Sequence, residues 1–234
     1  MRAIVRAVAA AGLATLVAGC ALGPTKSDPF ETWNRAMYAI HEPIDENIVR
    51  PVAQAYVDYV PRVVRLAVSN VFNNIDDMFS AINSGLQGKL DKMGNDLGRV
   101  ILNTGFGLGG LIDIATDAGI ERGMEDFGQT FGVWGLPQGP FLFVPVFGPT
   151  TVRDGSGVIV RVYLGPVGYI PDVPVRNTLY GIGALDIRAQ ALEASTIIDK
   201  AALDRYTFIR RAYLQRREYL VHDGNVPSAK EEDE

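Results

Sequence analysis

The side chains that could do chemistry do not form a known catalytic set in this sequence. Gly105, Gly107 and Gly110 match the G-x-G-x-x-G pattern of dinucleotide sites, and Asp126 follows about 20 residues later. That pattern requires a preceding strand and surrounding βαβ units, and the flanking sequence predicts neither. The triplet DFG at 126–128 lacks the companion motifs of a kinase. We therefore predict no catalytic residues, no enzyme activity and no cofactor.

The two histidines also predict no metal centre. His41 and His222 lie far apart in the sequence, and the chain has one cysteine, so no set of ligands has metal-binding spacing. We expect His41 to cap a helix or to face solvent. Asp76 and Asp77 are expected on a solvated helix face or at a cap.

The lone cysteine, Cys20, has a position that predicts covalent lipid attachment. Arg2 and Arg6 precede an uncharged stretch rich in Ala, Val and Leu, which is typical of a secretory signal and too short to span a bilayer. The stretch ends in small residues directly before Cys20, and this resembles the bacterial lipobox, in which the cysteine is acylated. We expect a signal peptide at 1–19 and an acylated tether at 20–27. Ala21 in place of Asp favours export to the outer membrane.

The composition of the mature chain predicts one domain that does not bind nucleic acid. Without the leader, 20 Lys and Arg remain against 27 Asp and Glu, a net charge of −7 with neutral histidines. An acidic chain is not attracted to nucleic acid or, in general, to anionic lipid. No second cysteine is available for an intramolecular disulfide. We expect a helical domain at 28–223 and a disordered acidic tail at 224–234.

An apolar segment at 126–154 is the most unusual feature of the domain. Residues 127–152 carry no charge, yet their glycines and prolines oppose a helix, and the apolar core at 141–147 is too short to span a membrane. A buried Pro-rich loop in a soluble core is the alternative. We predict that residues 139–149 form an apolar hairpin whose side chains face lipid or a channel mouth. The expected contacts are Phe141, Phe143, Val144 and Phe147.

The remaining sequence predicts helices. Asp28 and Pro29 are expected to begin the first, and Pro43 to end it. Pro61 opens a longer helix, residues 90–114 continue in helical spacing, and residues 175–194 and 203–222 predict two more. Residues 151–163 are compatible with either a helix or a strand. The glycines at 105–110, namely Gly105, Gly107, Gly109 and Gly110, are expected beside a lipid or another bulky group.

Several short stretches together resemble one family, MlaA (also called VacJ). They are NRAMY at 34–38, VRPVA at 49–53, DYVP at 58–61, LNT at 102–104, GLGGLID at 107–113, FGQT at 127–130, GPF at 139–141, PVFGP at 145–149, RD at 153–154 and RAQ at 188–190. Their order spans nearly the whole mature chain. Residues 39–46 carry more charge than the family pattern.

The resemblance implies an all-α, ring-like lipoprotein embedded in the inner, periplasm-facing leaflet of the outer membrane. Such a protein removes mislocalised phospholipids from the outer leaflet through an amphipathic channel and passes them to a soluble periplasmic carrier. It also implies association with a trimeric porin. The alternative function is a structural envelope lipoprotein that acts as a scaffold without transport.

Overall fold

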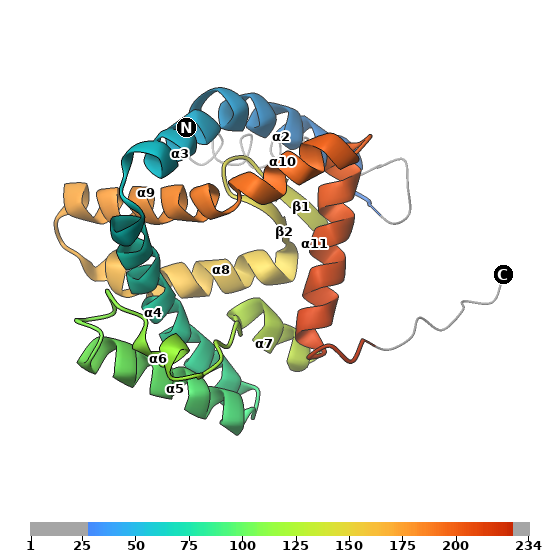
Figure 1. Cartoon of the computed structure of the whole chain (residues 1–234). Coiled ribbons are helices and arrows are strands. Elements are labelled where there is room, and N and C mark those ends of the chain that lie inside the picture. Colours follow the sequence, from blue (N-terminus) through green and yellow to red (C-terminus); the bar gives the residue numbers. More distant parts are fainter. Residues whose placement is uncertain (1–27, 227–234) are drawn as a thin grey trace, which may run out of the picture.

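Residues 28–226 are described by a computed structural model of the chain (Figure 1). The expected signal peptide at 1–19, the tether at 20–27 with Cys20, and the tail beyond residue 226 lie outside the described residues. Within them the chain is mostly helical. The helical elements are α2 Glu31–Ile44, η1 Asp45–Val49, α3 Arg50–Tyr59, α4 Arg62–Leu86, α5 Leu90–Gly105, α6 Ile114–Asp117, α7 Phe127–Val133, α8 Val152–Leu164, η2 Pro166–Tyr169, α9 Val173–Gln190, α10 Leu192–Ala201 and α11 Arg205–Val221.

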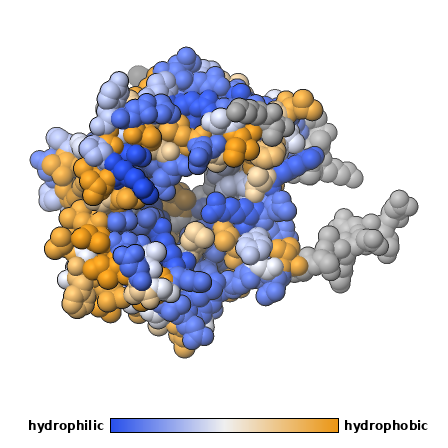
Figure 2. All heavy atoms as spheres, viewed as in Figure 1, coloured by the Kyte–Doolittle hydropathy of each residue, from blue (hydrophilic) through white to orange (hydrophobic). Residues whose placement is uncertain are grey.

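These helices form a ring-like body. α2, η1 and α3 make an arc along one side, α4 packs along α5, and α8 and α9 cross the middle of the view (Figure 1). α11 then runs from the start of the arc past β2 to α7. The space-filling view shows a hollow near the centre of this face (Figure 2). No helix within residues 28–226 is both long and apolar enough to cross a membrane.

The apolar segment forms an antiparallel hairpin, as predicted. β1 Phe141–Val144 pairs with β2 Gly148–Thr151, with Phe141 opposite Thr151 and Val144 opposite Gly148. The tip contains Val146 at φ 71°, a left-handed conformation that a β-branched residue rarely adopts. The hairpin is therefore held in a specific, strained shape at its tip.

The interior is unusually polar. Among residues 28–226, more of the buried side chains are polar than apolar, and the largest that are fully buried include Arg99, Gln129 and Asn34. Many large apolar side chains are exposed instead. Figure 2 shows a concentration of them along the edge where α8, η2 and the start of α9 lie near the loop after α5. Tyr163 and Phe106 on this edge are 76% and 72% exposed.

Several helix boundaries differ from prediction because tertiary contacts prevail over local signals. α2 begins at Glu31, since the Asp28 carboxylate is buried and accepts hydrogen bonds from Asn34 and Tyr206 instead of capping the helix. Pro43 lies inside α2 and does not end it. The π-helical turn η1 follows directly, so α2, η1 and α3 run on as one arc.

The boundaries of the later helices also differ from the predicted ones. The segment 90–114 is divided into α5, a glycine-rich turn and the short α6. Residues 152–164 are helical, which decides between the two predicted states. The segment 175–194 is interrupted at Ala191, where α9 gives way to α10. Thr151 begins α8 as its N-cap by accepting a hydrogen bond from the Asp154 backbone N–H.

Candidate functional site

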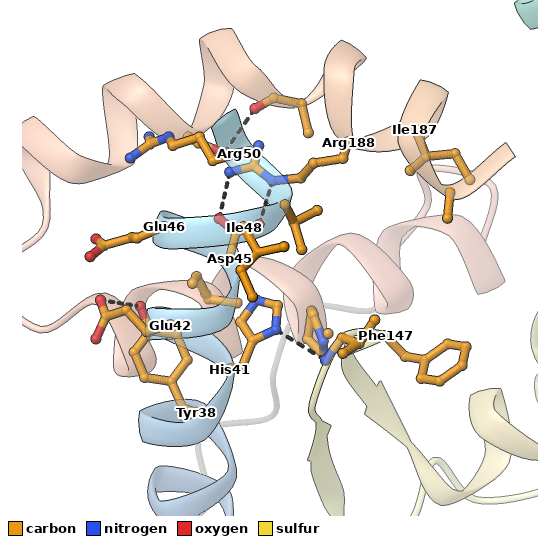
Figure 3. Close-up of a pocket in the computed structure, with 18 of the residues that line it drawn as sticks. Tyr38, His41, Glu42, Asp45, Glu46, Ile48, Arg50, Phe147, Ile187 and Arg188 are labelled. Atoms are coloured by element: carbon orange, nitrogen blue, oxygen red, sulfur yellow. Dashed lines mark hydrogen bonds and ion pairs between the residues drawn. The ribbon is translucent and has the colours of Figure 1, made fainter. Parts of the chain in front are cut away.

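A cavity of about 790 Å³ opens between the α2–η1–α3 arc, the hairpin tip, α9, α10 and the start of α11 (Figure 3). Its size falls within the roughly 300–1,000 Å³ of typical small-molecule sites. The side chains that line it include both long apolar and ionised groups. The lining comprises Tyr38, His41, Glu42, Asp45, Glu46, Ile48, Val49, Arg50, Val52, Val146, Phe147, Gly148, Pro149, Gly181, Ala184, Leu185, Ile187, Arg188, Ala191, Ser195, Ile198, Asp199, Arg205 and Ile209.

The charged and apolar groups lie at different ends of this cavity. Figure 3 shows Glu42, Glu46 and Arg50 on one side, with Phe147 and Ile187 on the other. Phe147 is 85% exposed at the hairpin tip, and Ile187 is also largely exposed. The cavity is therefore amphipathic along its length.

The helical spacing of the arc produces the charged end. Asp45 and Glu46 follow Glu42 by three and four residues, so both side chains project close to that of Glu42 along one side of the arc. Because Pro43 is accommodated within α2 and η1 follows without a break, this face continues past the proline. The continuous arc is what brings three carboxylates to one wall.

Arginines from the C-terminal helices neutralise these carboxylates. Arg188 of α9 forms a two-pronged pair with Asp45, with Nε–Oδ1 and Nη2–Oδ2 distances of 2.7 and 2.6 Å, and its Nη1 donates to Ser195 Oγ. Hydrogen bonds from Arg188 hold the pKa of Asp45 below its usual range. This pair is mostly buried and fixes α9 against the arc.

The other pairs are more open to solvent. Arg205 Nη1 lies 2.8 Å from Glu42 Oε1 and 3.0 Å from Glu46 Oε1. Arg50 Nη2 lies 2.5 Å from Asp199 Oδ2. These side chains are about 27–45% exposed. Ion pairs with this exposure contribute little to stability, roughly 0–1 kcal/mol, so a ligand can replace them at small cost.

His41 connects the arc to the hairpin tip. Its Nδ1 accepts a hydrogen bond from the Val146 backbone N–H at 3.1 Å (Figure 3). Burial lowers the pKa of His41 below its usual value, which favours the neutral ring that can accept this bond. The expected capping or solvated role was therefore wrong: His41 holds the strained Val146 in place.

Asn34 fixes the base of the same hairpin. It is fully buried, its Nδ2 donates to Phe141 O at 3.0 Å, and its Oδ1 accepts from Phe143 N at 2.9 Å. The amide thus pairs with the outer edge of β1 as a further strand would. This explains physically why the NRAMY stretch and the hairpin belong to one structural unit.

The predicted contact residues of the hairpin divide into two groups. Phe141 and Phe143 are each 3% exposed and pack among Tyr38, Tyr206 and Tyr213. The expectation that they face lipid or a channel mouth was wrong, because the alternation of β1 turns them toward α2 and α11. Val144 points to the other side and is partly exposed, and Phe147 reaches the cavity.

The four glycines at 105–110 also fall into two groups, those packed closely against the protein and those beside open space. A side chain on Gly107 would lie 2.2 Å from Ile112 O, and one on Gly110 would meet Asn74, so close packing within the protein accounts for both. Gly105 and Gly109 face open space. A contact of these two with lipid stays a prediction, as does the acylation of Cys20.

Only part of the charged wall could be predicted from the sequence. Residues 39–46 are more charged than the family pattern, but which charges face a cavity depends on the helix continuing through Pro43. The pairing arginines lie more than 140 residues further along the chain, beyond the reach of local spacing. Asp77 was also misplaced: it is fully buried against Arg99 and Arg122 and does not face solvent. Among residues 28–226, no cluster of three or more potential metal ligands occurs.

Comparison with known proteins agrees with this architecture. A family profile described as MlaA lipoprotein matches residues 26–220. The intermembrane phospholipid transport system lipoprotein MlaA of Escherichia coli (strain K12) is 32% identical over 220 residues, covering 91% of this chain and 87% of that protein. The protein of the same name from Haemophilus influenzae is 31% identical over 210 residues, covering 88% and 84%.

A solved structure gives the same result for the fold. A chain from work described as "Structural basis for maintenance of bacterial outer membrane lipid asymmetry" superposes with a TM-score of 0.74 at 32% identity, covering 84% of this chain and all of that one. With the family profile spanning nearly all the described residues, sequence and fold agree. The chain belongs to the MlaA lipoprotein family.

Proposed function

We propose that this protein is an outer-membrane lipoprotein that takes mislocalised phospholipids from the outer leaflet and passes them to a soluble periplasmic carrier. The observation that carries the proposal is the amphipathic cavity, which has ionised groups at one end and apolar side chains at the other. A phospholipid has the same two-part chemistry. Relatives named as intermembrane phospholipid transport lipoproteins support the assignment.

The surface supports a position in one leaflet. The exposed apolar edge at α8, η2 and α9, together with Phe106 and Leu108, would be covered by acyl chains. Gly105 and Gly109 lie in the same region and would contact lipid there. Acyl groups on Cys20 would add a second membrane attachment, since several apolar anchors are needed for stable binding. A periplasm-facing leaflet and a trimeric porin partner complete the proposal.

The transport step requires no covalent chemistry. The ionised side chains of the cavity are paired with one another, and none is arranged as a nucleophile with an adjacent base. We therefore propose binding and release of intact lipid. Release of fatty acid from phospholipid by the purified protein would contradict this part.

Site-specific crosslinking tests the cavity. A photoreactive residue at position 147 or 187 should form an adduct with the mass of a phospholipid in cells, whereas one at exposed Glu193, outside the cavity, should not. In parallel, deleting the gene should place phospholipid on the cell surface. Absence of a lipid adduct at 147 and 187, with a normal surface after deletion, would favour a scaffold without transport.

A further inference from the structure

The ionised groups of the cavity form a nearly balanced set of charges. Four carboxylates line it, from Glu42, Asp45, Glu46 and Asp199, against the guanidinium groups of Arg50, Arg188 and Arg205. His41 is neutral where it accepts the Val146 hydrogen bond. The lining thus carries both signs of charge and a net charge of −1.

The exposed fractions of these side chains separate one fixed ion pair from pairs that a ligand can replace. The Arg188 and Asp45 side chains are each 16% exposed and hold two helices together. Arg205, Glu42 and Glu46 are a third to nearly half exposed. Both signs of charge are therefore available to a ligand at the charged end of the cavity, within one group of contacting side chains.

We propose that this charged end is a binding site for zwitterionic lipid head groups that carry an ammonium and a phosphate, such as phosphoethanolamine, and that it selects against net-anionic head groups. The inference rests on the proposed function and adds the class of lipid. The phosphate lies against the guanidinium groups of Arg205 and Arg50, and the ammonium lies against Glu42 and Glu46. The acyl chains extend toward Ile187 and Phe147.

Charge balance supplies the selectivity. A zwitterionic head group replaces each existing ion pair by another, so no ionised group is left without a partner. An anionic head group engages the arginines but leaves Glu42 and Glu46 uncompensated, which is costly in a partly desolvated site. With one excess negative charge at several ångströms, we expect roughly three- to tenfold weaker loading.

The test offers the full-length lipoprotein, purified in detergent, an equal mixture of phosphatidylethanolamine and phosphatidylglycerol with identical acyl chains. Native mass spectrometry then measures the bound ratio. We expect the zwitterionic lipid to exceed the anionic one by about three- to tenfold. Glu42→Gln with Glu46→Gln, which makes the lining net positive, should reverse the preference.

Matched variants separate this site from general charge effects. Glu121→Gln with Glu193→Gln changes the net charge equally at exposed positions outside the cavity, and should keep the wild-type ratio. Glu46→Gln alone, at the most exposed of the pairs, should fold normally and shift the ratio part of the way. A shift of the same size in the control pair would overturn the proposal.

The remaining outcomes distinguish the proposed head-group selection from the proposed lipid transport. Equal loading of both lipids, unchanged in the Glu42 and Glu46 variants, overturns head-group selection and leaves lipid transport standing. Absence of any bound lipid overturns both. Water-soluble glycerophosphoethanolamine in millimolar excess should not displace the lipid, because it lacks the acyl chains. Displacement would show a site for the free head group and overturn a lipid site.

Discussion

Individual side chains in this protein act mainly as connectors between distant segments. Asn34 holds β1 through both atoms of its amide, and His41 holds the hairpin tip through one ring nitrogen. Arg188 joins α9 to the arc through Asp45. Each of these contacts joins residues that are more than 100 positions apart in the sequence.

The Asp45–Arg188 pair gives a pH-dependent prediction. Arg188 lowers the pKa of Asp45 in the folded state, so the pair contributes stability that is complete above the unfolded pKa of about 3.9 and is lost as pH falls through the lower folded value. Asp45→Asn should therefore reduce the free energy of unfolding at pH 7 by about 1–3 kcal/mol, since it leaves Arg188 partly buried without its partner. Urea unfolding at pH 7 and near pH 3 measures this. An equal loss at both pH values would contradict the pairing.

The hairpin phenylalanines give a second prediction, in which stability and function separate. Phe143→Ala should destabilise the fold by about 3–5 kcal/mol because it empties a buried aromatic cluster. Phe147→Asp should change the free energy of unfolding by less than about 0.5 kcal/mol, because the side chain is exposed, while lowering lipid loading. Thermal unfolding and lipid co-purification distinguish the two. A stable Phe143→Ala protein would show that this core is not what holds the hairpin.

At the scale of elements, close backbone approach decides where helices cross. A side chain on Gly157 of α8 would lie 2.5 Å from the backbone nitrogen of Gly128 in α7. The two helices therefore touch through their glycines. This crossing positions Asp154 and the base of β2 beside α11, and so supports one wall of the site indirectly.

Alanine substitutions at Gly157 and at Gly94 test this crossing, with Gly94 as the control position outside it. Gly157→Ala should destabilise the protein by more than about 1 kcal/mol, since neither backbone can yield without moving a helix. Gly94→Ala lies mid-helix in α5 beside open space, and should stabilise by about 0.5–1 kcal/mol through its helix propensity. Denaturant midpoints of the two variants should move in opposite directions. Movement in the same direction would contradict the crossing.

The elements were predictable to the extent that local signals governed them. The hairpin followed from the glycines and prolines around residues 141–147, and the final helix from its spacing. Pro43 misled because a proline inside a helix can kink it without ending it, and here the chain continues through Pro43 into η1 while Arg188 of α9 and Arg205 of α11 pair with this arc. Burial of Phe143 and Arg217 could not be predicted, since both depend on partners far along the chain.

On the scale of the molecule, α11 closes the ring. At its start, Tyr206 donates to the buried Asp28 near the N-terminus, and Arg35 of α2 pairs with Asp204. Near its end, Arg217 contacts Asp126 before α7 and Asp154 in α8. The two ends of one helix thus join segments that would otherwise be free to separate.

Removing the second of these junctions should open the ring. Arg217→Met removes the cation that joins Asp126 to the buried Asp154 and leaves Asp154 paired with Arg153 alone, which should cost about 1–3 kcal/mol. Arg211→Met, at an exposed position of the same helix, should have little effect. Hydrogen exchange of α7 and α11 would report the loss of protection. Unchanged exchange in both helices would show that the ring closes by other contacts.

The polar interior and apolar exterior also determine how the protein responds to temperature. Unfolding raises heat capacity by exposing apolar surface to water, by about 12–15 cal/mol/K per residue in ordinary globular domains. Here many large apolar side chains are already outside, and much of what unfolding exposes is amide, carboxylate and guanidinium, which lowers heat capacity. Calorimetry in detergent should therefore give a smaller increment per residue. The stability curve is then flatter, and stability changes less between cold and warm growth conditions than in a soluble protein of the same length.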